Sequence, residues 1–243
     1  MATASANVPD EKSILCESCG YTLDGLPDGA NCPECGKPAS ESIADDGRRA
    51  CAWEKNPSLA TFLITTLQVN IAPRNFFRKM FTRSSDNRAG VFGNIQVLIQ
   101  SILFGCTAGF HWHWYYREIL LQKQNGSEWW VGLVMTVISG ISYLSINWLA
   151  SKLTAWEARY RGIRLPLHVV RRGLKYHLAS CLPVAFFALV TTAGFYYLRK
   201  TNRISPEYTT HYLYVLSGEV IIAAFYLFVT YWAAMKSMMY ANR

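Results

Sequence analysis

Four cysteines near the start of the chain have the spacing of a metal site. They form two Cys-x-x-Cys pairs, Cys16 with Cys19 and Cys32 with Cys35, separated by twelve residues. Four thiolates in this arrangement supply the tetrahedral sulfur cage that Zn²⁺ prefers. A glycine follows each pair and lets the backbone turn tightly around the sulfur atoms. The pattern predicts a structural zinc site, which we favour over a redox dithiol.

The charge and chemistry around the cysteines limit what this region can do. Thiolates stay reduced only in a cytosol-like compartment. Residues 1–57 have a net charge of −5, whereas the rest of the chain has +13. Nucleic-acid binding depends on neutralising phosphates, so an acidic module argues against it. Four protein thiolates leave no open position for a catalytic water. The remaining interpretations are a docking module for a protein partner and a structural cap.

Three ionisable side chains fall within apolar segments that could cross a membrane. Glu219 is the one carboxylate in such a segment, and His111 and His113 lie at a comparable depth in another. Ionisable groups inside a membrane are costly and often functional. Glu219 could pair with His111 or His113 across the bundle and form a proton or cation site. Only one of the two histidines should face inward, because they point in different directions on a helix. The alternative, which we favour, is a protonated or hydrogen-bonded structural glutamate.

Composition divides the chain into parts that must position these residues. We expect a disordered tail over 1–13, a zinc ribbon over 14–38, a linker over 39–56, an interfacial helix and basic entry segment over 57–90, and a four-span transmembrane domain over 91–243. The polar start of the chain lacks the apolar run of a secretory signal. The ribbon is too short to fold without its metal, and we expect Tyr21, Leu23 and Leu26 to form its small core.

The segment after the linker is typical of a helix that lies in the membrane interface. Ser58 can cap a helix in which apolar residues recur near the helical period, and Pro73 should stop it. That helix is too interrupted to span a bilayer, and it could instead pack against the bundle. Phe76 and Phe77 then follow among several basic residues, which suits a phospholipid headgroup layer.

Four long apolar runs predict an all-α integral membrane bundle. The runs are Val91–Tyr116, Trp129–Leu149, Leu178–Leu198 and Tyr212–Ala234. Each reaches the ~20 residues needed to cross a ~30 Å hydrocarbon core. Tryptophan and tyrosine side chains cluster at their ends, as expected where rings lie at the headgroup level. Within the first run, Gly105 and Gly109 can bring another helix close, either within the bundle or in a second copy of the chain.

Lysine and arginine counts predict the orientation. Fourteen of these residues lie before the first span, between the second and third, and after the fourth, against five in the other two loops. The positive-inside rule therefore places both termini and the middle loop in the cytoplasm, with the chain in the cytoplasmic membrane of a cell. A further hypothesis is that the acidic ribbon docks on the basic middle loop, Lys152–Lys175. The alternative is that these bases only set the topology and contact anionic lipid.

Two motifs resemble those of a known bacterial arrangement, a zinc ribbon joined to a Yip-family-like membrane domain. The ribbon residues that carry the resemblance are Cys16, Cys19, Gly20, Tyr21, Gly25, Leu26, Pro27, Cys32, Pro33, Glu34, Cys35 and Gly36. The Yip-like part is Pro73-Arg-Asn-Phe76-Phe77-Arg-Lys-Met80 and the spans that follow. The resemblance implies a non-enzymatic helical bundle, whose eukaryotic relatives bind small GTPases. That family usually has five spans and this chain has four, so no GTPase-binding residues are carried over.

Two functions follow from these patterns. The first is a non-catalytic membrane scaffold or interaction protein that binds a partner through its ribbon. The second is a small transporter or channel that uses Glu219. No Ser-His-Asp order, His-Glu-x-x-His signature or glycine-rich phosphate loop occurs, so we expect no enzyme.

Overall fold

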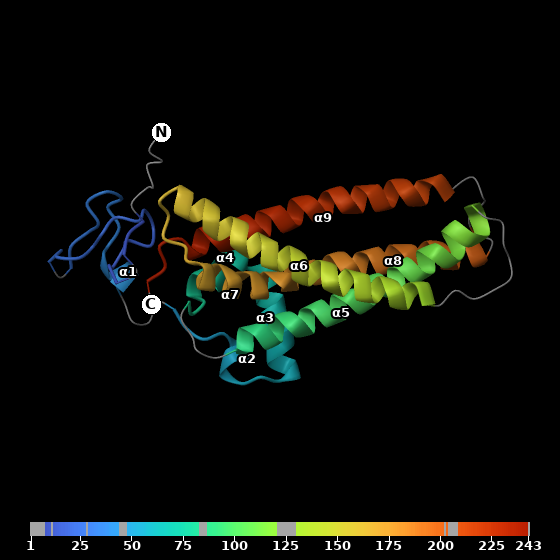
Figure 1. The fold of residues 1–243 in the computed structure, drawn as a ribbon, viewed down its shortest axis with the longest axis horizontal. Helices are drawn as coiled ribbons and strands as arrows, with labels where there is room; N and C mark the ends of the chain where they lie inside the picture. The colour runs from blue at the N-terminus through green and yellow to red at the C-terminus, as the bar shows by residue number, and fades with distance from the viewer. Residues whose placement is uncertain are drawn as a thin grey trace. The chain divides into compact units, whose positions relative to one another are not determined.

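The computed structural model describes residues 8–10, 12–27, 29–43, 48–82, 87–120, 130–201, 203 and 209–242 (Figure 1). Its helices are α1 (Ser40–Ile43), α2 (Ala52–Lys55), α3 (Leu59–Ile71), α4 (Pro73–Lys79), α5 (Arg88–Phe110), η1 (His111–Leu120), α6 (Trp130–Tyr160), α7 (Leu167–His177), η2 (Leu178–Ser180), α8 (Cys181–Lys200) and α9 (Thr209–Met238). In the described residues, β-pairing is limited to isolated bridges. The predicted all-α fold is confirmed. Most of the predicted disordered tail, and Trp129 at the start of the second predicted span, lie outside the described residues.

The chain forms two compact units, and each is described by itself. Unit 1 consists of Met1–Gly93, Asn147–His177 and Thr230–Arg243, and unit 2 of Asn94–Ile146 and Leu178–Val229. The cysteine pairs belong to unit 1, whereas Glu219, His111 and His113 belong to unit 2. The candidate metal ligands and the ionisable residues of the apolar helices therefore lie in different units, and each group is described by itself.

Four helical stretches are long and apolar enough to cross a membrane, which confirms the number of predicted spans. They are Arg88–Tyr116, Trp130–Tyr160, Leu167–Lys200 and Thr210–Met238. Their outward surfaces are apolar: on α9, Ile221, Ile222 and Phe225 are each 70% exposed. Contact with water costs about 25 cal/mol for each Å² of such surface, so these helices suit a hydrocarbon environment.

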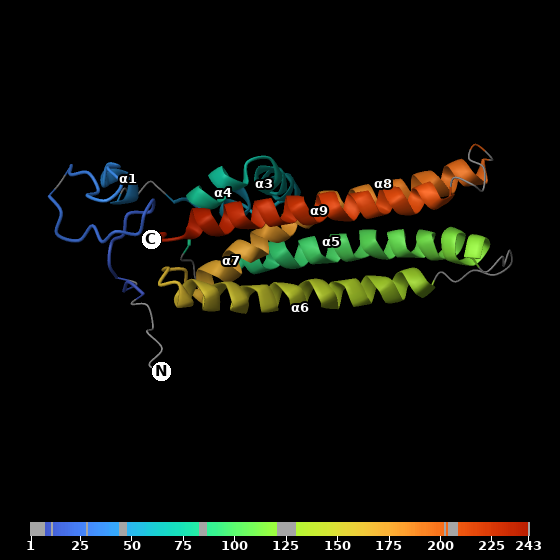
Figure 2. The ribbon, with the colours of Figure 1, turned by 90° about the horizontal axis from the view of Figure 1, so that it is seen from above.

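In unit 2, portions of α5, α6, α8 and α9 run alongside one another (Figures 1 and 2). Small residues bring α5 and α6 together, because a Cβ added at Gly105 would lie 2.6 Å from the carbonyl oxygen of Gly132. The Gly105-x-x-x-Gly109 motif therefore packs within the chain. At His111 the first span changes from α-helix to the π-helix η1, a rare conformation.

In unit 1, the structure confirms how the segment after the linker begins and breaks. Ser58 caps α3, with its side chain accepting a hydrogen bond from the Thr61 N–H in a capping box. α3 ends at Ile71, and Pro73 occupies the first turn of α4, where its missing N–H costs nothing. Buried rings then form the core of this unit, with Phe92 5.0 Å from Tyr176 between ring centroids.

The basic middle loop, Lys152–Lys175, is largely helical. Residues 152–160 belong to α6 and residues 167–175 to α7, so only 161–166 connect the two helices. α7 buries Val169, Val170 and Leu174, and this apolar face holds the segment as a helix. The sequence pattern concealed it because α7 also carries several charged side chains.

Candidate metal centre

The two cysteine pairs lie in two hairpins that share one backbone pattern. We call residues 14–23 the first knuckle and residues 30–39 the second knuckle. Each backbone hydrogen bond and the β-bridge of the first knuckle recur in the second knuckle, sixteen residues later. The Cys16 N–H donates to the Tyr21 carbonyl (2.8 Å), as the Cys32 N–H does to the Lys37 carbonyl (2.7 Å). The Gly20 N–H donates to the Cys16 carbonyl (2.8 Å), as the Gly36 N–H does to the Cys32 carbonyl (2.9 Å). The Leu23 N–H donates to the Ile14 carbonyl (2.7 Å), as the Ala39 N–H does to the Ala30 carbonyl (3.0 Å). The knuckles are therefore a structural repeat related by a shift of sixteen residues.

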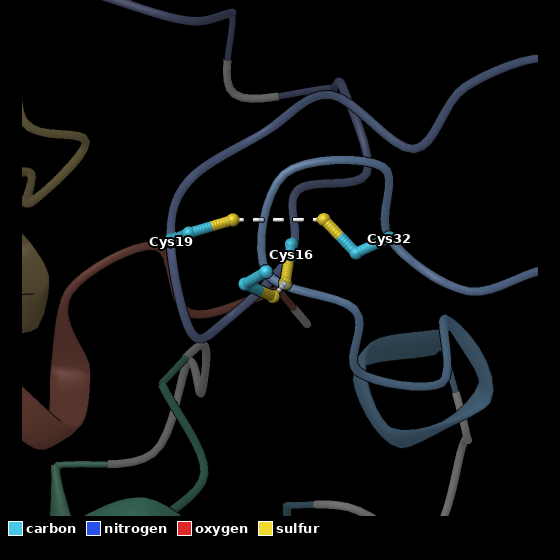
Figure 3. A group of neighbouring side chains, drawn as sticks. Cys16, Cys19 and Cys32 are labelled. Carbon is cyan, nitrogen blue, oxygen red and sulfur yellow. Dashed lines mark hydrogen bonds between the residues drawn. The ribbon is translucent and has the colours of Figure 1, made fainter.

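This repeat brings the four thiols to one point. The four Sγ atoms lie within 4.8 Å of one another. Cys16 Sγ is 3.5 Å from Cys35 Sγ, and Cys19 Sγ is 3.6 Å from Cys32 Sγ, so each close pair joins the two knuckles. Figure 3 shows the sulfurs of Cys19 and Cys32 pointing toward each other. A tetrahedron of sulfurs with ~2.3 Å metal–sulfur bonds has edges of roughly 3.8 Å, so the cluster fits a metal ion.

The thiols differ in their proton affinity. Burial by itself raises the pKa of Cys16, but hydrogen bonds from the backbone of Ser18 and Cys19 and from neighbouring thiols lower that pKa to about 7. Burial, together with hydrogen bonds to the other three thiols, raises the pKa of Cys19 to about 12, although a backbone hydrogen bond from Tyr21 lowers it in part. A metal must therefore displace protons from this cluster, so metal affinity should fall as the pH falls.

A metal held here would act as a cross-link between the knuckles. The buried core of the module is very small, consisting of Leu23 and Ala39 around Cys16 and Cys32. So little apolar surface cannot fold a segment of this size, and a bound ion would supply the missing stability. Tyr21, which we expected in this core, is 37% exposed, and Ala39 fills the position equivalent to Leu23.

The residues that follow α9 hold the first knuckle. The Asn242 side chain forms two hydrogen bonds with the backbone of Leu15, as a paired β-strand would. Its Oδ1 accepts from the Leu15 N–H (3.0 Å), and its Nδ2 donates to the Leu15 carbonyl (2.6 Å). The same Nδ2 also donates to the carbonyl of Ser42 (2.8 Å). Figures 1 and 2 both show the end of the chain beside the blue N-terminal loops. Residues 239–242 are therefore part of the structure around the metal centre.

A buried ion pair adds a second attachment. Arg48 forms a two-pronged pair with the Glu17 carboxylate of the first knuckle, at 2.9 and 3.0 Å. The Arg48 side chain is only 3% exposed, and it also donates to the carbonyls of Phe77, Met80 and Ser237. Every branch of the guanidinium is thus used, which is the condition under which a buried charge is tolerated.

Arg164 supplies a third attachment from the short α6–α7 connection. It donates to the carbonyls of Asp10 and Ser13, immediately before the first knuckle, and to Asn242 Oδ1 (2.7 Å). Of the bases in the predicted docking loop, Arg164 therefore contacts the N-terminal region. Arg172 does not share this role, because it pairs with Glu54. Between the described residues, Arg164 contacts backbone carbonyls and the Asn242 side chain.

The two knuckles differ most clearly at their equivalent glycines. Gly20 and Gly36 both have positive φ, +85° and +71°, where a Cβ is unfavourable. A Cβ at Gly20 would lie 2.6 Å from the ring of Tyr240, whereas a Cβ at Gly36 would meet nothing within 4 Å. Among the described residues, the 239–242 segment covers the first knuckle, and the second knuckle is open at this position.

A separate cluster in unit 1 holds a buried carboxylate that the sequence placed in a linker. Glu54 is 8% exposed, and its Oε1 accepts hydrogen bonds from Arg172 and from the Tyr176 hydroxyl (2.5 Å). The Cys51 thiol lies 3.5 Å from the same hydroxyl. These contacts tie α2 to α7, so the end of the expected linker belongs to the core of unit 1.

The ionisable candidates of unit 2 contact different side chains. Glu219 Oε1 accepts from the Thr191 hydroxyl, and His111 Nδ1 lies 2.7 Å from the Tyr212 hydroxyl. The His113 ring lies edge-on to Tyr196, with centroids 6.1 Å apart. The direct pair of Glu219 with a histidine, suggested from the sequence, is absent from these contacts between described side chains. The second carboxylate oxygen of Glu219, Oε2, is buried and has no hydrogen-bond partner in the described residues.

Comparison of the chain with protein-family models, with curated proteins and with solved structures finds no match. Function is therefore argued from the residues themselves.

Sequence reasoning did not identify the side chains that hold the first knuckle. Glu17 and Arg48 were counted only as charges, and Arg164 only as one of the bases of the middle loop that set the orientation or attract the acidic ribbon. Asn242 carried no signal. The repeat of sixteen residues could have helped, because it aligns Glu17 with Pro33 and so marks a difference between the knuckles.

Proposed function

We propose that the chain is a multi-pass membrane protein whose cysteine module binds a structural zinc ion and docks a protein partner at the cytoplasmic face. Four thiolates favour zinc over the oxygen-preferring cations, and a closed set of four protein ligands suits a structural role. The positive-inside count and the need for reduced thiols both support a cytoplasmic module. A scaffold or interaction role follows, without enzymatic activity or nucleic-acid binding.

One observation carries the interaction role. The knuckles have the same backbone, and the chain covers the first with Tyr240 and the 239–242 segment, while the second is open at Gly36. Pro33, Glu34 and Lys37 of the second knuckle are exposed. The covered knuckle shows that this backbone form accepts a peptide segment against its glycine, so the open knuckle offers an equivalent surface to another protein.

The test compares charge-reversed knuckle residues in the full chain purified from native membranes. We expect about one zinc per chain and a stoichiometric partner that is lost with Glu34→Lys and Lys37→Glu, while zinc is retained. Lys12→Glu, at an exposed position before the first knuckle, is the matched control and should retain the partner. Chains that carry no metal, or a partner that survives the second-knuckle changes, would contradict the proposal.

A second candidate, a small transporter or channel, is favoured by Glu219. Its Oε2 is a buried carboxylate oxygen with no partner among the described residues, as expected of a group that binds a proton or cation in transit. Flux of protons or monovalent cations in proteoliposomes should then disappear with Glu219→Gln and persist with Glu157→Gln, an exposed acid on α6. Flux that is absent from the unaltered protein removes this candidate.

A further inference from the structure

The first knuckle has an outward-facing backbone edge at Leu15. Leu15 faces Thr22 in an antiparallel bridge, and the two cross-hairpin hydrogen bonds join the residues on either side of this pair. In a pair flanked in this way, the backbone N–H and C=O groups of both residues point away from the hairpin. Leu15 therefore presents one donor and one acceptor outward, as an edge strand does.

The second knuckle repeats this edge at Asn31. Asn31 faces Pro38 in the equivalent bridge, which is flanked by the equivalent hydrogen bonds. Leu15 is completely buried, whereas Asn31 is exposed. No hydrogen bond joins the Asn31 N–H or carbonyl to another described residue. The second knuckle thus offers to solvent the same pair of backbone groups that the first knuckle has buried.

The 239–242 segment shows how such an edge is bound. The Asn242 carboxamide pairs with both outward groups of Leu15, at 3.0 and 2.6 Å. The Tyr240 ring lies where it would contact a Cβ at Gly20. An asparagine side chain suits a backbone edge because it offers an acceptor and a donor side by side. The binding element is therefore an aromatic ring against the glycine and a carboxamide two positions later.

The first knuckle also makes contacts with this segment that the second knuckle cannot reproduce. The Glu17 carboxylate accepts from the Asn242 N–H at 2.9 Å, and Arg164 donates to Asn242 Oδ1 at 2.7 Å. Pro33 occupies the position equivalent to Glu17. A segment bound to the second knuckle loses the Glu17 contact, so its binding should be weaker and reversible, as suits a partner that comes and goes.

We infer that the second knuckle binds a partner segment in which an aromatic residue is followed, two positions later, by asparagine. The aromatic ring lies against Gly36, where a Cβ would meet no described atom within 4 Å, and the carboxamide pairs with the backbone of Asn31. The segment belongs to another protein, because the chain's own Tyr240 and Asn242 occupy the first knuckle. This inference rests on the proposed interaction role and names the chemistry that the partner presents.

The probe is a labelled synthetic peptide with the sequence of residues 236–243, which contains the pattern. Fluorescence anisotropy measures its binding to the full, metal-loaded chain in neutral detergent, and we expect saturable binding of one peptide per chain. Aspartate in place of the peptide's asparagine keeps the shape but removes the donor, so it should weaken binding roughly tenfold. Phenylalanine in place of its tyrosine keeps the ring and should change the affinity by less than about threefold.

Gly36→Ala tests the location, because its Cβ occupies the space that the ring needs. The matched control is Gly25→Ala, since Gly25 also has positive φ, +83° against +71°, and a Cβ there also meets no described atom within 4 Å. Gly36→Ala should weaken peptide binding roughly tenfold or more, and Gly25→Ala by less than about threefold. Equal effects of the two variants would overturn the inference.

Crosslinking keeps the test decisive if Gly36→Ala loses its metal. A peptide with a benzophenone on the tyrosine ring should crosslink within 30–39 of the unaltered chain. Crosslinks within 14–23 would show that the peptide only displaces the chain's own segment, and an aspartate peptide that binds as tightly would remove the role of the carboxamide; either result overturns the inference. A peptide that does not bind refutes this inference alone, because charge reversal at Glu34 and Lys37 tests the interaction role separately.

Discussion

The first and second knuckles share a backbone, yet the rest of the chain treats them differently. Both place two thiols in the cluster and both turn at a glycine with positive φ. Only the first has Glu17, which pairs with buried Arg48, where the second has Pro33. The repeated features bring the four thiols together, and the features that are not repeated attach the module to the rest of unit 1. A module of this kind can fold on one ion and still present two unlike faces.

The largest expected effect is shared by the two knuckles, because both contribute to the same cluster. Cys16→Ser and Cys35→Ser should each abolish metal retention and unfold the whole module, since a structural zinc ion is worth on the order of 10 kcal/mol. Metal analysis and alkylation of the remaining thiols measure the result. Cys106→Ser, on α5, should have no effect on metal content. A module that remains protected after either ligand is lost would show that the metal does not fold it.

The next effect separates the knuckles. Glu17→Gln removes one partner of a pair in which the Arg48 side chain is 3% exposed, and leaving such a charge uncompensated costs about 3 kcal/mol. Glu34→Gln changes an exposed side chain of the second knuckle and should cost less than about 0.5 kcal/mol. Thermal unfolding in detergent compares the two variants. Equal losses would mean that the Glu17–Arg48 pair does not anchor the module.

Asn242→Ala tests whether the 239–242 segment covers the first knuckle. The change removes the hydrogen bonds of the side chain to Leu15 and Ser42, and leaving these groups unpaired costs about 2 kcal/mol. Backbone hydrogen exchange should rise in 239–242 and in the first knuckle. Exchange in the second knuckle should stay unchanged, provided that the metal is retained. A uniform rise across both knuckles would contradict a separate role for this segment.

The smallest effect comes from the equivalent glycines. Gly20→Ala and Gly36→Ala each place a Cβ at positive φ, which costs about 1 kcal/mol. At position 20 the Cβ also displaces the Tyr240 ring, so only that variant should increase exchange in 239–242. In a Tyr240→Ala background the two alanine variants should become equivalent. If the two alanine variants still differ in hydrogen exchange in the Tyr240→Ala background, the Tyr240 ring is not the cause of the difference.

Much of the fold could be predicted from residues that are close in sequence. The four long apolar helices, the cap at Ser58 and the break at Pro73 follow from hydropathy and local backbone chemistry, and the structure has all of them. The helical α7 was missed because its charges resemble those of a loop, although its buried valines and leucine hold it in the core. Tyr21 was misplaced because apolar character alone does not indicate which side of a hairpin meets the core.

Cysteine spacing was sufficient to predict a cluster of four thiols that could hold a metal ion, because the backbone turn around each Cys-x-x-Cys pair is local and repeats. The covering of one knuckle and the pairing of Glu54 with Arg172 required the folded chain. The contacts of Asn242 with Glu17 and of Arg172 with Glu54 join residues 225 and 118 positions apart. No local pattern encodes partners at such separations, since packing of the intervening helices decides which side chains meet.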